Sequence, residues 1–245
     1  SLRSGDNVLM SDGALIGFPG KPDAAPGAEA GEDDAFNLFD TGAFLVQRGQ
    51  RVALLGPNGS GKTSFLRTVL GQIDPLAGSV RLGASLRIGY LPQKQDWLDP
   101  EKNILEQVLD MSDLDIPAAR NLLARFLFTG DDIYKPISAL SGGELSRVAL
   151  AILTIRGANF LLLDEPTTHL DVDSQEILQD VLQHFSGTII FVSHDRYLVD
   201  ALATHVWVID SSRVRQFKGN YTAYLAALER ERLERVEEVR GGPLS

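Results

Sequence analysis

The sequence predicts an α/β fold in which a largely parallel sheet is flanked by helices on both faces. Short apolar runs of strand length alternate with segments whose apolar residues recur at helical spacing. A glycine-rich turn joins the first clear strand to the first clear helix, and two later apolar strands end in polar residues. This alternation is typical of βα units, whose parallel strands are buried on both sides.

Length and composition are those of an ordinary globular protein. The chain has 245 residues, of which 44% are hydrophobic and 23% charged, enough for one large or two small domains. It has no cysteine, which excludes disulfides, thiolate zinc sites and a cysteine nucleophile. No apolar run approaches the roughly 20 residues that span a bilayer. The net charge of -10 disfavours general nucleic-acid binding, although a local basic patch could escape this average.

The predicted elements follow the chain in order. The chain begins at Ser1 with neither Met nor a signal-like region, so we expect a fragment of a longer protein. Residues 8–18 predict a strand pair or an edge hairpin, and residues 19–35, rich in Pro, Gly, Ala and acids, predict a flexible acidic insertion. Further strands are predicted at 51–55, 86–91, 160–163, 188–192 and 205–209. Helices are predicted at 62–70, at 104–128 with a break near Pro117, around 177–182, and at 221–240, whose charged second half should be solvated.

A phosphate-binding pattern lies between the strand at 51–55 and the helix at 62–70. In G-x-x-x-x-G-K-[ST], the glycines let backbone N–H groups turn inward around phosphate oxygens, the lysine reaches the β and γ phosphates, and the hydroxyl binds Mg²⁺. Lys62 would be that lysine, with a catalytic role, and Thr63 the metal ligand. The alternative is a chance glycine-rich turn, which would require neither the strand before it nor the helix after it. The candidate nucleotide-binding residues here are Gly56, Pro57, Asn58, Gly59, Ser60, Gly61, Lys62, Thr63 and Ser64.

Two acids follow the apolar strand at 160–163. A buried strand that ends in Asp164 and Glu165 is costly unless the acids meet a cation or the site needs their charge. Asp164 suits a carboxylate that holds Mg²⁺, and Glu165 suits a base or water-positioning group for attack on the γ phosphate. The alternative is that both acids simply begin a loop.

His194 follows the strand at 188–192, at the edge of the sheet where ligands of open α/β folds bind. It could polarise or sense the γ phosphate, or it could be an ordinary residue at a helix start with Asp195 as the N-cap. Gln93, at the end of a strand, has a side chain suited to reaching a metal-bound water. His184 has only a structural interpretation.

The stretch LSGGE at 140–144 begins a helix in an unusual way. Ser141 and Glu144 have the spacing of a capping box, in which each side chain satisfies a backbone donor of the other. Gly142 and Gly143 each cost on the order of 1 kcal/mol relative to Ala in a helix, so they suggest that something comes close to the backbone. A bare helix N-terminus also suits an anion.

Together, GPNGSGKT, YLPQ, LSGGE, LLLDEP, the Leu170–Asp171 pair and VSHDR resemble the ordered motifs of an ATP-binding-cassette ATPase domain, over about residues 8–217. The resemblance implies a P-loop fold with an antiparallel β subdomain and a helical signature subdomain at about 101–156, in a domain spanning 1–220 that is followed by a charged tail at 221–245. It implies ATP and Mg²⁺ as cofactors. The catalytic residues would be Glu165, His194 and Lys62, and the metal-site residues Thr63, Gln93 and Asp164.

The same resemblance implies a partner, a second cassette that meets this one head to tail, in the same polypeptide or a homodimer. Ser141, Gly142, Gly143 and Glu144 would then contact nucleotide bound to that partner, and Asp171 would help join the two sites. For the adenine, a stacked aromatic ring is implied before the P-loop. Phe18 is favoured for it, and Phe36 is the rival.

Finer features resemble the soluble tandem-cassette ABC-F proteins, which act on the ribosome. These are THLD at 168–171, with T-T-H-L-D in place of the usual T-N-H-L-D, and FKGNY at 217–221 before a charged helix. Only 46 residues separate Gln93 from Leu140, so the long interdomain arm is absent, and with Glu144 this indicates the second cassette. The resemblance implies a cytoplasmic protein that contacts the ribosome and its RNA.

Three alternatives share this chemistry. The chain could be the nucleotide-binding domain of a membrane transporter, with a membrane subunit as its partner. A recombination or chromosome-maintenance ATPase would need a long coiled coil between the P-loop and LSGGE, for which there is no room. A silent ATP-binding scaffold would be expected to lack Lys62 or Glu165, and both are present.

Overall fold

The computed structural model describes residues 6–18 and 36–240, with side chains described up to residue 235. The predicted flexible insertion at 19–35 lies outside the described residues, as do the two chain ends.

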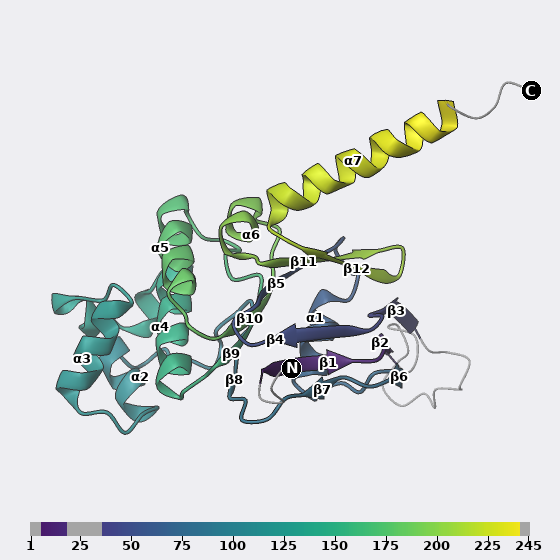
Figure 1. Cartoon of the computed structure of the whole chain (residues 1–245). Helices are drawn as coiled ribbons and strands as arrows, with labels where there is room; N and C mark the ends of the chain where they lie inside the picture. Colours follow the sequence, from purple (N-terminus) through teal and green to yellow (C-terminus); the bar gives the residue numbers. More distant parts are fainter. Residues whose placement is uncertain (1–5, 19–35, 241–245) are drawn as a thin grey trace, which may run out of the picture.

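The larger sheet has nine strands among the described residues, in the order β6-β2-β3-β12-β11-β5-β10-β9-β8 (Figure 1). The strands from β8 to β11 in this order are parallel, whereas β12 is antiparallel to β11 and β2 is antiparallel to both its neighbours. This confirms the predicted largely parallel sheet with an antiparallel part. The strands are β2 (Ala14–Phe18), β3 (Phe36–Asp40), β5 (Arg51–Leu55), β6 (Ala77–Gly78), β8 (Ile88–Leu91), β9 (Phe160–Asp164), β10 (Thr188–Val192), β11 (His205–Asp210) and β12 (Arg213–Lys218).

A smaller sheet has the order β4-β1-β7, with β1 at Asn7–Ser11, β4 at Phe44–Gln47 and β7 at Arg81–Leu82. The two strands predicted at 8–18 are present, but the predicted pairing is wrong, because β1 and β2 pair with different partners in different sheets. Both strands bury apolar side chains, such as Leu9 and Ile16, in the same core cluster. Each strand instead pairs with segments remote in sequence, β4 and β7 for β1 and β3 and β6 for β2, so the short turn between β1 and β2 does not set their pairing.

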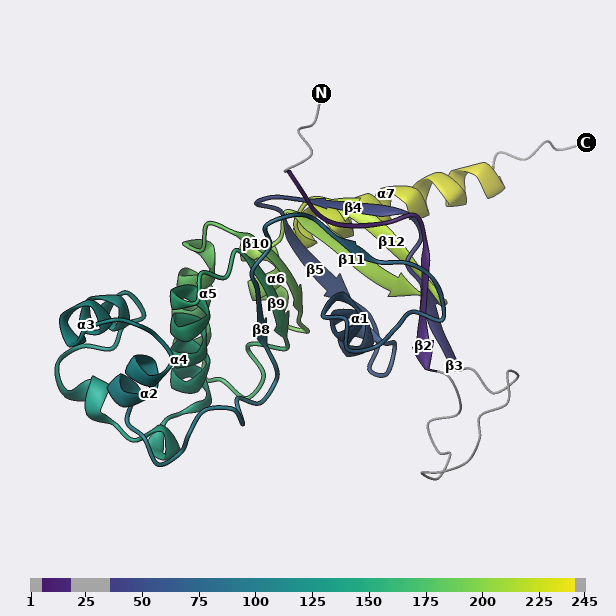
Figure 2. The ribbon, with the colours of Figure 1, turned by 90° about the horizontal axis from the view of Figure 1, so that it is seen from below.

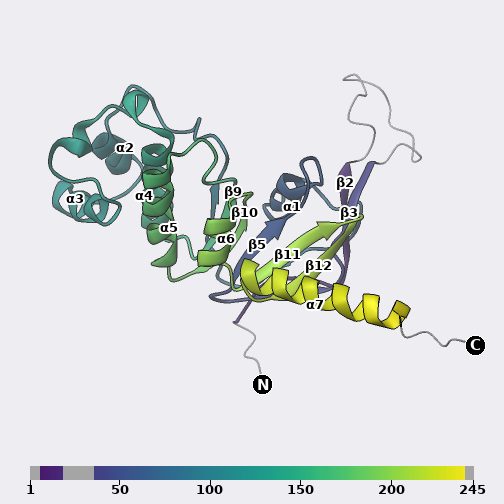
Figure 3. The same cartoon turned by 90° about the horizontal axis from the view of Figure 1, so that it is seen from above.

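Helices cover both faces of the larger sheet. Figures 2 and 3 show α1 on the face opposite to α6 and α7, with α4 and α5 beside β8 to β10 and α2 and α3 farther out. The helices are α1 (Lys62–Val69), α2 (Ile104–Asp110), α3 (Ile116–Arg125), α4 (Gly142–Ile155), α5 (Val172–Gln183), α6 (Arg196–Leu202) and α7 (Tyr221–Arg240), with short 3-10 turns η2 (Gly130–Tyr134) and η3 (Ile137–Ala139). Pro117 lies in the first turn of α3, where a missing N–H is tolerated. None of the described helices is both long and apolar enough to cross a membrane.

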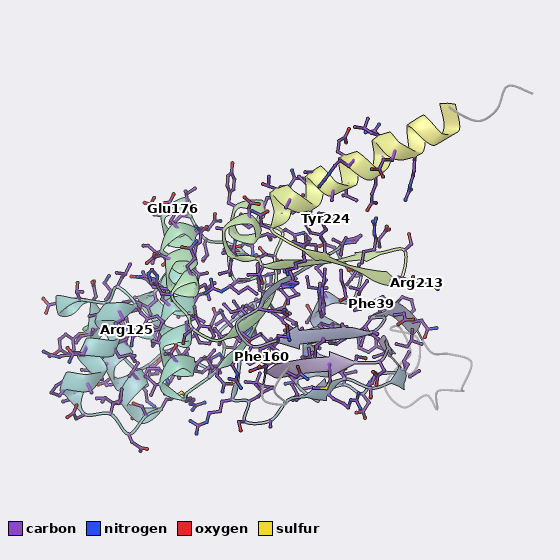
Figure 4. The ribbon with its side chains drawn as sticks, in the orientation of Figure 1. Phe39, Arg125, Phe160, Glu176, Arg213 and Tyr224 are labelled. Atoms are coloured by element: carbon purple, nitrogen blue, oxygen red, sulfur yellow. The ribbon has the colours of Figure 1, made fainter. Side chains whose placement is uncertain are left out.

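Strand β9 shows why the central strands are apolar throughout. Its successive side chains point to opposite faces, so Leu161 and Leu163 pack with the cluster that includes α2 to α6. Phe160 (labelled in Figure 4) and Leu162 pack with the cluster around α1. Asp164 ends the strand, so the fold delivers this carboxylate to the end of a fully buried element.

Candidate nucleotide site

A cleft of about 610 Å³ opens at the carboxyl ends of β9 and β10, beside the start of α1. Ligands of open α/β sheets bind at this edge. The structure brings together here most of the residues that the sequence predicted for the site, which are Phe18, Asn58, Gly59, Gly61, Lys62, Thr63, Ser64, Gln93, Asp164, Glu165 and His194. Phe36, Leu38, Thr168 and Val192 complete the lining.

The P-loop, residues 56–63, has the backbone that a phosphate cradle requires. Gly59 and Gly61 have φ angles of +76° and +98°, which other residues rarely adopt. A Cβ on Gly61 would lie 2.9 Å from Leu38 Cδ1, and one on Gly56 would lie 2.8 Å from Ser60 Oγ. The buried Ser60 hydroxyl has no hydrogen-bond partner, and no side chain caps α1. The loop therefore offers polar groups that suit an anion.

Lys62 is buried, with 7% of its surface exposed, and it is turned back toward its own loop. Its Nζ donates hydrogen bonds to the carbonyl oxygens of Gly56 (2.9 Å) and Pro57 (2.8 Å). Burial lowers the pKa of Lys62, while the negative charges of Glu165 and Asp164 act in the opposite direction. The ammonium group is thus placed between the P-loop and the two acids.

Asp164 is only 6% exposed, and burial raises its pKa. Hydrogen bonds from Thr63 and Tyr90 and the charges of Arg67 and Lys62 oppose this rise. Burial also raises the pKa of the Tyr90 phenol, and the neighbouring Asp164 raises it further. The sequence analysis missed Tyr90, whose one available signal was its position in the strand that leads to Gln93.

The donor set suits Mg²⁺ but does not complete its coordination. Within the described part of the chain, no three His, Cys, Asp or Glu side chains are grouped so that they could hold a metal ion. The Thr63 hydroxyl and the Asp164 carboxylate are adjacent oxygen donors, and the exposed Gln93 amide lines the same cleft. Mg²⁺ is commonly held by one or two protein oxygens together with substrate phosphates, which matches this set.

Glu165 and His194 contact each other at the mouth of the cleft. His194 Nε2 lies 3.2 Å from Glu165 Oε1, and the His194 backbone N–H donates to Glu165 Oε2 at 3.3 Å. Glu165 has a φ of +51°, a strained backbone for a non-glycine residue of the kind that concentrates at functional sites. Asp195 caps α6 as predicted, with its Oδ1 accepting from the N–H groups of Tyr197 and Leu198. His194 therefore lies at a helix start and also contacts Glu165.

The sequence model of the ABC transporter family matches residues 39–168, more than half of the chain. The chain belongs to this family. It is an ATP-binding cassette.

Several named proteins are similar to this cassette. It is 38% identical over 241 residues to the putative ATP-binding protein YdiF of Bacillus subtilis, covering 96% of this chain and 35% of YdiF. It is 40% identical over 222 residues to the probable ATP-binding protein YbiT of Escherichia coli O157:H7, covering 89% and 39%. It is 37% identical over 194 residues to the energy-dependent translational throttle protein EttA of Escherichia coli K12, covering 76% and 35%. The cassette thus spans well under half of the length of each of these relatives.

Solved structures confirm the predicted cassette fold. A dimeric ATP-binding cassette, described in a post-hydrolysis state bound to ADP and phosphate, has a TM-score of 0.67 at 20% identity, covering 86% of this chain and 98% of that one. The protein cbiO1 from Clostridium perfringens, part of an ABC transporter complex, has a TM-score of 0.69 at 23% identity, covering 96% and 97%.

The signature segment of the cassette, Ser141–Glu144, lies outside the nucleotide cleft. Ser141 is the N-cap of α4 and forms the predicted capping box with Glu144. Gly142 lines a neighbouring hollow of about 240 Å³, which shares Gln93 and Glu165 with the cleft. Asp171 caps α5, where its Oδ1 accepts from the Ser174 N–H at 2.8 Å, and does not line the cleft. The structure therefore does not bring these residues to the cassette's own P-loop.

Gly143 has a packing role that the sequence analysis missed. A Cβ at this position would lie 2.6 Å from Ser174 Cβ on α5. The close approach expected at the two glycines is thus made, at Gly143, by a helix of the same chain. At Gly142 the nearest atom to such a Cβ is Leu170 Cδ2, at 3.2 Å.

Both candidates for the adenine-stacking ring lie at the cleft. Phe18 on β2 is paired directly with Phe36 on β3, so the two rings are cross-strand neighbours. The choice of Phe18 over Phe36 stays a prediction.

Proposed function

We propose that this cassette hydrolyses ATP, that it is fully active only when paired with a second cassette, and that it works as a nucleotide-gated switch of the ABC-F type. The observation that carries the proposal is the contact between Glu165 and His194 beside a buried lysine and a buried aspartate. A carboxylate held by a histidine beside a phosphate cradle is suited to proton abstraction from water.

Each residue would have a separate task. Bound MgATP would supply the γ-phosphoryl group and the metal charge that offsets its oxygens. The P-loop amides and Lys62 would hold the phosphates, while Thr63, Asp164 and Gln93 would hold the metal and its water. Glu165 would accept the proton of the attacking water, and His194, 3.2 Å away, would fix the orientation of that carboxylate.

Pairing follows from where the signature segment lies. The Ser141 side chain and Gly142 are exposed and outside the cleft, although the segment opens a helix suited to an anion. Nucleotide held by a second cassette would supply that anion. Asp171, at the start of α5, would then lie between the two sites.

The ribosome is the proposed site of action. THLD and FKGNY support ABC-F membership, and one similar protein is named a translational throttle. We accordingly propose a cytoplasmic protein whose second cassette is this chain, with the division into a domain at 1–220, a helical subdomain at 101–156 and a charged tail at 221–245. ATP-dependent co-sedimentation with ribosomes tests this, and co-purification with a membrane subunit instead would favour the transporter alternative.

The decisive test of hydrolysis is Glu165→Gln. The substitution keeps the shape and removes the charge, so turnover should fall by about the 10²- to 10⁴-fold typical of losing a general base. Binding should persist, and MgATP should accumulate a closed pair that wild type reopens, visible by size-exclusion chromatography with the partner cassette or a second copy at high concentration. Turnover within a few-fold of wild type would remove Glu165 from the reaction and direct attention to His194.

A further inference from the structure

The capping box that starts α4 places a carboxylate in the first turn of the helix offered to the second cassette. Glu144 Oε2 accepts the Ser141 backbone N–H at 2.9 Å, and Ser141 Oγ accepts the Glu144 N–H at 3.2 Å. The Ser141 hydroxyl also hydrogen-bonds the Glu144 carboxylate, so both side chains are tied to each other at this helix start. Burial raises the pKa of Glu144, but the Ser141 N–H and Lys135 outweigh this and hold the pKa below its usual value. A charged carboxylate at this point repels an incoming phosphate.

Lys135 lies against that carboxylate. Its Nζ is 3.3 Å from Glu144 Oε1 and 2.9 Å from Asp132 Oδ1, so one ammonium group serves two acids. The Lys135 backbone is anchored, since its carbonyl accepts the Ile104 N–H at 3.2 Å and its own N–H donates to the Asp132 carbonyl at 3.0 Å. Neither bond depends on the lysine side chain, which can be changed without removing them.

We propose that Lys135 is a positioning residue for the phosphate that the second cassette presents. It offsets the charge of Glu144 and holds that carboxylate against the Ser141 N–H, which leaves the first-turn amides of Gly142 and Gly143 for the anion. Lys135 itself acts through Glu144 and touches no nucleotide. This inference rests on the proposed function, because it requires that α4 of one cassette face the nucleotide of another.

The test measures the ATP concentration that gives half-maximal pairing in the Glu165→Gln background. Lys135→Met keeps the length of the side chain and removes its charge, so this concentration should rise about three- to tenfold, the scale of one surface charge acting on a multiply charged phosphate. The increase should shrink as salt is added. Lys135→Arg should restore pairing, and ATP affinity at protein concentrations too low for pairing should be unchanged in every Lys135 variant.

Two controls separate this role from a structural one. Lys102→Met removes a matched lysine of the same region, which bridges Asp99 and Asp110, and should not affect pairing. Asp132→Asn loosens the η2 side of the contact but leaves the Lys135–Glu144 pair, and should not weaken pairing either. In a Glu144→Gln background, which keeps a capping acceptor without the charge, Lys135→Met should lose its effect.

The outcomes are distinct. Pairing by Lys135→Met at the parent's ATP concentration would overturn the inference and leave the proposed function standing. An undiminished effect in the Glu144→Gln background would overturn it as well, because Lys135 would then act by another route. A parent that never pairs at any ATP concentration would remove the paired state and this inference together.

Discussion

Asp164 brings a negative charge into the edge of the core, where β9 meets the P-loop. Its environment is unfavourable on balance, since burial raises its pKa despite bonds from Thr63 and Tyr90. The same position puts the carboxylate beside the Thr63 hydroxyl, where the two oxygens could hold the proposed Mg²⁺. The fold therefore gives up stability at this residue for the sake of the site.

Because the buried charge of Asp164 destabilises the folded state, a variant without this charge should be more stable. Above the raised pKa, Asp164 is charged in both the folded and unfolded states, and the folded state bears the full penalty. Below about 3.9, the ordinary value for Asp, it is protonated in both states and the penalty vanishes. Asp164→Asn should therefore raise the melting temperature at pH 7 without nucleotide, and the gain should shrink as the pH is lowered toward 4. A variant that melts below wild type at pH 7 would contradict this account, whereas loss of MgATP binding by the same variant is expected.

Substitutions in the P-loop should weaken the binding of MgATP. Lys62→Ala removes a buried cation and Thr63→Ala a metal ligand, and either should weaken MgATP binding by about 10²-fold or more, the scale of removing one partner from a buried charge pair. Titration with a fluorescent ATP analogue measures this, with Lys102→Ala as an exposed control. Unchanged affinity in both variants would mean that phosphate binds elsewhere.

Residues of the site could be predicted where chemistry and chain order coincide. Lys62, Asp164 and Glu165 each follow a strand or open a helix, so a local pattern was enough to find them. Tyr90 and Ser174 act through contacts made only after β8 meets the cleft and α5 meets α4, and no local pattern marks them.

At the scale of elements, the central strands were predictable because burial on both faces makes them apolar throughout, as β9 and β10 show. The small sheet was not predictable, because β1 pairs with β4, which is remote in sequence, and because β7 has only two residues. Loop length and apolar pattern between β1 and β2 are compatible with a hairpin. In the folded chain, however, β1 pairs with β4 and β7, whereas β2 pairs with β3 and β6.

The packing of α4 on α5 predicts unequal effects at two adjacent glycines. Gly143→Ala would place a methyl group 2.6 Å from Ser174 Cβ, so overpacking should cost about 1–3 kcal/mol in the free energy of unfolding. Gly142→Ala meets its nearest neighbour at 3.2 Å, a flexible leucine methyl, and should cost less. Denaturant unfolding of both variants measures the difference. Adding Ser174→Gly should recover part of the loss at Gly143, and equal costs at the two glycines would contradict this packing role.

At the scale of the whole molecule, α7 is fastened near its start and then extends beyond the sheet (Figure 3). Asp200 on α6 accepts the Thr222 N–H at 2.7 Å, Arg196 stacks over the Tyr221 ring at 5.8 Å, and Tyr224 (labelled in Figure 4) packs edge-on against Phe217. Further along, the Arg215–Glu231 pair at 2.9 Å is exposed. Residues 231–235 are exposed, which agrees with the prediction that the charged second half of the helix is solvated. The helix base thus adjoins α6, whose first residues follow His194.

The nucleotide cleft and the signature segment are different surfaces of one cassette, so a substitution at one should leave the other working. The nucleotide cleft is lined by P-loop residues, Lys62 and the two acids, whereas the signature segment lies outside its lining and has an exposed N-cap. A bulky cation at Ser141 should therefore leave ATP binding by the isolated cassette nearly intact and block ATP-driven pairing, because it fills the surface meant for the partner's phosphate.

Ser141→Arg tests this in the Glu165→Gln background, with nucleotide affinity measured at low protein concentration and pairing measured by size-exclusion chromatography with MgATP. Ser141→Ala is the matched control, since it loses the same N-cap, at about 1 kcal/mol, without filling the surface. We expect pairing to be abolished by Ser141→Arg and only weakened by Ser141→Ala, with melting temperatures lowered alike. If Ser141→Arg instead loses ATP affinity as an isolated cassette, the segment acts on its own nucleotide, and the head-to-tail pair, together with the role assigned to Lys135, would have to be abandoned.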